Sequence, residues 1–208
     1  MIPWETAGLF FTASLALALA PGPDNIFVLT QSALHGRVAG IFITLGLCTG
    51  LLVHTAAVSL GVAVIFQTSA LAFNLLKVLG AAYLLYLAWQ AFRAGASELP
   101  RGDCAGAGRA RLYGRGVIMN VMNPKVAIFF LAFLPQFADP GRGSLTLQLF
   151  LFGAIFMAAT LLVFGSIAWS AGLLGAWLRR SRRVQIVMNR LAGAVFVGLA
   201  LRLATVER

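Results

Sequence analysis

Two short polar segments interrupt apolar stretches of the chain and contain the residues best suited to chemistry. They are Pro21-Gly22-Pro23-Asp24-Asn25 and Asn120-Val-Met-Asn123-Pro124-Lys125. Prolines remove backbone donors and disrupt the preceding helical turn, and glycine permits backbone conformations closed to other residues. Asn123 suits a helix N-cap and Pro124 the first helical position. Each segment therefore predicts a helix break with a charged side chain beside it.

The two charged side chains predict a site for a zwitterion such as an amino acid. A half-helix N-terminus and the ammonium of Lys125 favour a carboxylate, while the carboxylate of Asp24 favours an ammonium or carries a coupling proton. We expect the amides of Asn25, Asn120 and Asn123 to supply neutral hydrogen bonds. Two plainer interpretations stay open: Asp24 only caps the following half-helix, or Asp24 and Lys125 only neutralise each other.

One further titratable residue is a candidate, and metal chemistry is not indicated. His54 is the only ionisable side chain in its apolar stretch, so it is either a second candidate for proton coupling or a neutral packing residue. No group of His, Cys and carboxylate residues has metal-ligand spacing, and neither a Walker A nor a GxSxG motif occurs. We therefore expect no metal and no cofactor.

The composition places these residues in a lipid bilayer. Of the 208 residues, 60% are hydrophobic and 11% charged, whereas a soluble domain carries about 25% charged residues. No charged residue occurs in 38–76 or in 143–178, although about 20 apolar residues already suffice to span a membrane. The formal net charge of +10 indicates topology and anionic headgroups rather than nucleic acid.

The apolar pattern predicts an all-α integral membrane protein with six transmembrane helices. The first and fourth are broken at the prolines, and the basic connection at about 93–115 is the only long linker. We expect the chain to form one transmembrane transporter domain. The six predicted helices lie at about 6–34, 38–66, 70–92, 116–137, 145–178 and 184–205.

The basic residues predict an orientation and a depth for the site. Cytoplasmic loops are enriched in Lys and Arg, and the first, third and fifth connections hold most of them. Both termini are then periplasmic. Asp24 lies 13 residues before Arg37, and Lys125 lies 10 residues after Arg115. At about 1.5 Å per residue, both charges are expected near mid-membrane at similar depth. The basic residues of these connections are Arg37, Arg93, Arg101, Arg109, Arg111, Arg115, Arg179, Arg180, Arg182 and Arg183.

The two halves of the chain, about 1–95 and 114–208, resemble each other. Residues 77–83 (KVLGAAY) align without gaps to 190–196 (RLAGAVF). With three helices in each half, a true repeat has opposite topology in the membrane, and inverted repeats with broken helices are typical of transporters. The alternative is chance similarity between apolar helices.

Two pairs of glycines, Gly36/Gly40 and Gly46/Gly50, favour close helix contacts, either within the monomer or in a homodimer.

Two segments resemble the signatures of the lysine-exporter/homoserine–threonine-efflux (LysE/RhtB) family. The first is APGPDNIFVLTQSALHGRVAG at 20–40, and the second is NPK at 123–125 followed by FFLAFLPQF at 129–137. The similarity extends over the whole chain and is nearest the homoserine, threonine and leucine branch. It implies a proton-driven exporter of amino acids or their derivatives in the bacterial inner membrane, without nucleotide or metal.

The sequence therefore predicts a secondary exporter that works by alternating access between inverted halves. Two other classes remain as alternatives. An integral-membrane enzyme acting on lipid could use Asp24, His54 and Lys125 as acid–base groups, but two of these are expected too deep to meet a headgroup. A passive channel, a scaffold or an exporter of another small solute is the second alternative.

Overall fold

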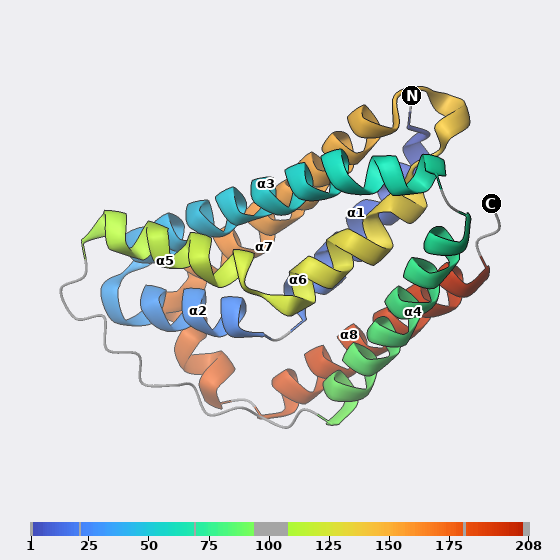
Figure 1. The fold of residues 1–208 in the computed structure, drawn as a ribbon. Coiled ribbons are helices and arrows are strands. Elements are labelled where there is room, and N and C mark those ends of the chain that lie inside the picture. Colours follow the sequence, from blue (N-terminus) through green and yellow to red (C-terminus); the bar gives the residue numbers. More distant parts are fainter. Residues whose placement is uncertain (1, 21, 69, 94–107, 181, 206–208) are drawn as a thin grey trace.

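The computed structural model describes residues 2–20, 22–68, 70–93, 108–180 and 182–205, and these form helices joined by short turns (Figure 1). No strand occurs among them, which confirms the all-α prediction. Pro21 and most of the basic connection, including Arg101, lie outside the described residues. The α-helices are α1 (Trp4–Leu19), α2 (Pro23–His35), α3 (Arg37–Thr68), α4 (Ala70–Arg93), α5 (Arg109–Val121), α6 (Pro124–Ile128), α7 (Leu145–Arg180) and α8 (Arg182–Thr205).

Both predicted helix breaks are present. The axes of α1 and α2 differ by 63°, and α5 differs by 50° from the helical segment 124–137. Pro23 is the first residue of α2, preceded by Gly22 in an extended conformation. Asn123 is the N-cap of α6, and Pro124 is its first residue. The proline rings fix a helical φ where no backbone donor is needed, so each break ends one helix and starts the next.

The fourth predicted helix ends at Phe137 as expected but begins earlier and changes its winding after the break. It begins at Arg109 rather than near residue 116, and the guanidinium of Arg109 lies 5.7 Å from the ring of Phe42. The long stems of arginines let a helix continue past the apolar region in this way. After α6 the backbone changes to a π-helix, η1 (Phe129–Phe133), and then to a 3-10 helix, η2 (Leu134–Phe137). Pro135 explains the second change, because it cannot donate to a regular α-helical ladder.

Two helix pairs, α3 with α7 and α4 with α8, run antiparallel, whereas α5 runs parallel to α3 (Figure 1). α3 and α7 lie side by side across the molecule, α4 packs along α8, and α5 packs along α3 while α1 and α2 pack against α7. Between them, buried phenylalanines from α1, α6–η2 and α7 form the centre of the larger apolar core. These are Phe10, Phe129, Phe130, Phe133, Phe137, Phe152 and Phe156.

Long apolar helices fit a membrane. Within the described residues, α3 and α7 each contain a stretch long and apolar enough to span it, at Arg37–Gly61 and Leu145–Ser170. The two bent pairs each pass the same test when taken as one span, and α8 contains a shorter apolar stretch at Asn189–Leu201. The structure therefore supports an all-α membrane protein, while the count of six spans remains a prediction.

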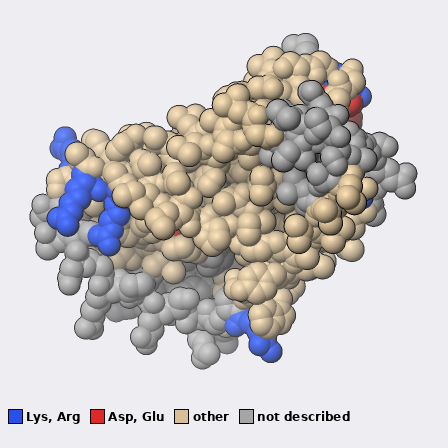
Figure 2. Space-filling model, viewed as in Figure 1, with Lys and Arg blue, Asp and Glu red and all other residues tan. Residues whose placement is uncertain are grey.

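Basic side chains gather at the end of the molecule where α5 begins and at the C-terminal end of α4 (Figure 2). Arg37, Arg109 and Arg115 each lie over an aromatic ring at the first of these ends. The N-terminus and the start of α7 lie at the opposite end (Figure 1). The described basic residues of the first and third connections thus share one side, as the orientation argument requires.

Three of the four glycines in the small-residue pairs make close contacts within the monomer. A Cβ on Gly46 would fall against the backbone oxygen of Tyr113 in α5, and one on Gly50 would lie 2.7 Å from the side chain of Asn120. A Cβ on Gly40 would overlap Ser32. Gly36 instead ends α2 with a φ of 83°. Glycine is therefore needed where α3 crosses α5 and α2.

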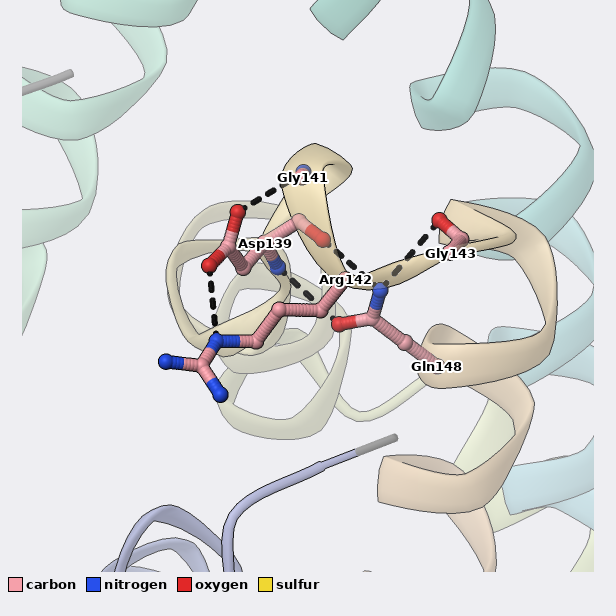
Figure 3. Close-up of polar contacts among 5 residues, drawn as sticks. All are labelled: Asp139, Gly141, Arg142, Gly143 and Gln148. Atoms are coloured by element: carbon pink, nitrogen blue, oxygen red, sulfur yellow. Dashed lines mark hydrogen bonds and ion pairs between the residues drawn. The ribbon is translucent and has the colours of Figure 1, made fainter.

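A side-chain lock closes the turn between η2 and α7 (Figure 3). The buried amide of Gln148 accepts from the backbone N–H of Asp139 at 3.0 Å and donates to its carbonyl at 2.8 Å. The carboxylate of Asp139 accepts from the backbone N–H of Gly141 at 2.8 Å and from Arg142 at 2.9 Å. This turn fixes where the fourth predicted span ends and α7 begins.

We expect Gly46→Ala to lower the thermal unfolding midpoint of the purified protein. The methyl group would push against backbone of α5, and overpacking of this kind costs about 1–3 kcal/mol. Gly61→Ala is the matched control on the same helix, since a Cβ there meets nothing within 4 Å. Equal midpoints for the two variants would contradict the close α3–α5 crossing.

We expect Gln148→Leu to speed hydrogen exchange of the backbone amide of Asp139 by about 10-fold, because a buried hydrogen bond is lost without replacement. Mass spectrometry of peptides covering residues 138–144 measures this. Arg142→Ala serves as the comparison, since its ion pair with Asp139 is more than half exposed and such pairs contribute little. Exchange that responds equally to both variants would argue against the lock.

Candidate functional site

The ammonium of Lys125 reaches across from α6 to the end of α1. Its Nζ donates to the carbonyl oxygen of Ala20 at 2.9 Å and to that of Leu17 at 3.3 Å. The last carbonyls of a helix have no partner within the helix, and a cation near them is favoured by the helix dipole. Lys125 thus satisfies backbone groups that the first break leaves open.

The side chain of Asn123 connects the two breaks. Its Oδ1 accepts from the backbone N–H of Lys125 at 3.0 Å, which is the predicted N-cap. Its Nδ2 donates to Oδ2 of Asp24 at 2.9 Å. Asp24 belongs to the first turn of α2, where the helix dipole favours a negative charge. One amide therefore caps α6 and holds the carboxylate of the other broken helix.

A small buried cavity lies between the two breaks. Its volume is about 20 Å³, roughly what a single water molecule needs. Asp24, Asn120 and Lys125 line it, together with Thr160 of α7. Asp24 is 4% exposed, and its Oδ1 and the hydroxyl of Thr160 have no hydrogen-bond partner among the described residues. This cavity, the inner cavity, therefore contains polar atoms that are free to bind a water molecule or a substrate group.

Asp24 and Lys125 are neighbours but not a direct ion pair. Both line the inner cavity, yet within the described residues their charged atoms do not come within 4.0 Å of each other. Asn123 and the carbonyls of α1 occupy the groups that would otherwise meet. The two charges thus lie side by side without a direct contact, and the interpretation in which they only neutralise each other stays a prediction.

The other predicted site residues surround this arrangement. Asn25 donates to the carbonyl oxygen of Ala18 at 2.6 Å and so supports the end of α1. Asn120 is buried at the C-terminal end of α5, and Nε2 of His54 lies 3.1 Å from its backbone oxygen. Since a carbonyl only accepts, this nitrogen of His54 carries the hydrogen. His54 thus supports the second break from α3.

A second, larger cavity opens on the other side of Lys125. It has a volume of about 710 Å³ and lies between the breaks and the α4–α8 pair. Gly22, Asn123 and Lys125 form its inner end, and Arg93 belongs to its lining at the C-terminal end of α4. We call it the vestibule. Lys125 lines both cavities and so separates them.

Sequence reasoning missed Thr160 and the aromatic residues of α4. Thr160 is one hydroxyl in a long apolar helix, and nothing in its spacing marks it as facing Asp24. Tyr86 and Trp89 line the vestibule, but in the sequence they read as interfacial aromatics of a membrane helix. Their placement follows from packing between helices distant in the chain.

Comparison with known proteins agrees with this architecture. The family model for LysE type translocators matches residues 15–207. Homoserine/homoserine lactone efflux proteins of Salmonella typhimurium and Salmonella typhi are each 31% identical over 94% of both chains. An uncharacterized membrane protein of Vibrio cholerae is 31% identical over 95% of this chain and 96% of its own. No solved structure matches the chain.

These matches cover nearly the whole chain and exclude the membrane-enzyme alternative. A translocator family and efflux-protein relatives indicate a transporter and not an enzyme. The apolar helices broken at two points fit a membrane. The chain is a membrane transporter and belongs to the LysE type translocator family.

Proposed function

We propose that this protein is a secondary exporter of amino acids or their derivatives, of the homoserine, threonine or leucine type, across the bacterial inner membrane. Its family and the efflux activity named for its relatives support this substrate class. The observation on which the proposal depends is the meeting of two broken helices. One contributes the carboxylate of Asp24 and the other the ammonium of Lys125, joined through Asn123.

The binding site is a zwitterion receptor built on these groups. An ammonium has three donors, and the described bonds of Lys125 use two of them, so one remains for a substrate carboxylate. The unpartnered Oδ1 of Asp24 accepts from the substrate ammonium. Asn25, Asn120 and Asn123 hold the surrounding polar network, and the breaks at Pro21, Gly22, Pro23 and Pro124 keep backbone groups available at this depth.

Transport is coupled to proton antiport through Asp24. A carboxylate at membrane depth is costly and marks a functional group, and one group that binds either a proton or the substrate ammonium gives exchange of the two. His54 is the second candidate for this coupling. Its bond to the Asn120 carbonyl gives it a supporting role that a proton carrier does not need.

Alternating access moves the two halves of one transmembrane domain, about 1–95 and 114–208, against each other. Six spans in a three-plus-three inverted repeat fit the antiparallel pairing of α3 with α7 and of α4 with α8. The basic side faces the cytoplasm and its anionic headgroups, and both termini are periplasmic. A homodimer remains compatible with this arrangement, although the close glycine contacts described above lie within one chain.

We expect Asp24→Asn and Lys125→Gln each to lower export at least 100-fold. Each variant removes one charge from the receptor, while glutamine keeps donors for the carbonyls of α1. Uptake of labelled homoserine, threonine or leucine into inside-out vesicles with an acidic interior measures export. Glu5→Gln and Lys77→Gln are the matched controls away from the site. Undiminished uptake in both site variants would overturn the assignment.

His54→Gln is expected to keep proton-coupled export within about 3-fold of the native rate, because a glutamine amide can still donate to the Asn120 carbonyl. His54→Leu leaves that carbonyl without its partner, and such a loss costs about 1–3 kcal/mol, seen as a lower thermal midpoint. Proton coupling is measured by comparing uptake of the labelled amino acid into vesicles with and without a protonophore, for the native protein and for each variant. If His54→Gln abolished the effect of the protonophore, the coupling would belong to His54 instead of Asp24.

A further inference from the structure

The vestibule has one aromatic wall. Tyr83, Tyr86 and Trp89 line it and follow one another at intervals of three along α4. Their ring centroids are 6.0 Å apart from Tyr83 to Tyr86 and 6.2 Å from Tyr86 to Trp89, so the rings form a row. The buried ring of Phe196 faces the same space from α8. Such a surface offers packing to an apolar or aromatic group.

The charge of the vestibule has a single sign. Lys125 lies at the inner end, and Arg93 is in the lining with its guanidinium 4.6 Å from the ring of Trp89. The described lining contains no Asp or Glu. Asp24 lines the inner cavity and not the vestibule. An anionic group is therefore favoured here, and an ammonium finds no counter-charge until it passes Lys125.

The inner end of the vestibule leaves Lys125 accessible because of a glycine. A Cβ on Gly22 would lie 3.0 Å from Nζ of Lys125 and 3.6 Å from its Cε. Without that Cβ, the remaining donor of the ammonium can meet a carboxylate entering from the vestibule. The volume of about 710 Å³ falls in the range of pockets for ligands well above a small amino acid in size.

We propose that the vestibule is a docking site for carboxylates with a large apolar or aromatic side chain, and that it does not recognise the amino group. The carboxylate binds Lys125, and the side chain packs on Tyr83, Tyr86 and Trp89. Among the proposed substrates this favours the leucine type and larger apolar amino acids over homoserine and threonine, and N-acylated amino acids dock equally well. This inference rests on the proposed function for its place in transport, with Asp24 recognising the ammonium at a later step.

Calorimetric titration of the full-length Asp24→Asn variant in detergent tests the docking site without any transport step and without the carboxylate proposed to bind the substrate ammonium. The three ligands are L-phenylalanine, N-acetyl-L-phenylalanine and L-phenylalaninamide. We expect the first two to bind with dissociation constants within about 3-fold of each other and the amide, which lacks the carboxylate, to bind at least 10-fold more weakly. Equal binding of the amide, or at least 10-fold weaker binding of the N-acetyl compound, would overturn the proposal.

Variants of the aromatic wall distinguish a loss of ligand binding from a general loss of stability. Tyr86→Ala and Trp89→Ala are each expected to weaken binding of N-acetyl-L-phenylalanine about 3- to 10-fold, in line with the strength of aromatic contacts. Leu85→Ala is the matched control, since Leu85 is a half-exposed neighbour on α4 that does not line the vestibule. Wall variants that bind like Leu85→Ala would overturn the assignment of the side-chain site.

The same ligands and variants test the docking site separately from the proposed export function. Asp24→Asn is expected to abolish export but to leave binding of N-acetyl-L-phenylalanine within 2-fold of native, because Asp24 lies behind Lys125. If the native protein exported no amino acid but bound these ligands as expected, the export function would fail and the docking site would stand. If Asp24→Asn weakened N-acetyl-L-phenylalanine binding 10-fold or more, the separation of the two steps would be wrong.

Discussion

In a bilayer, the backbone N–H and C=O groups freed by a helix break need hydrogen-bond partners within the protein. The rest of this structure depends on which side chains supply those hydrogen bonds. The ammonium of Lys125 in one half binds carbonyls at the end of α1 in the other. Asn123 caps its own half-helix and holds Asp24 of the other half. The first break is thus completed by a side chain from the second, and Asn123 ties the second break to the carboxylate of the first.

These contacts between the two breaks explain how structural and functional needs coincide at one place. The groups that stabilise the breaks are charged and polar, and they are the groups that an amino acid can bind. In the proposed mechanism, a substrate carboxylate takes the remaining donor of Lys125, while the substrate ammonium binds the open oxygen of Asp24. The proposal thus places the substrate on the groups that join the two halves, next to the two cavities that Lys125 lines.

The sequence was sufficient to predict much of this site. The prolines placed both breaks, and Asn123-Pro124 predicted the observed cap. Counting from the arginines predicted that Asp24 and Lys125 could meet, and both line the inner cavity. The cross-helix bonds of Lys125 could not be predicted, because they depend on the angle at which the halves meet. The position of Thr160 in the inner cavity could not be predicted for the same reason, since it depends on how α7 packs against α1 and α2.

A crystal structure of the protein saturated with an exported amino acid tests the central claim most directly. The account predicts one ligand between the two breaks, with its carboxylate within hydrogen-bond distance of Nζ of Lys125 and its ammonium at Oδ1 of Asp24. A ligand bound elsewhere, with Lys125 still holding only the carbonyls of Leu17 and Ala20, would contradict it.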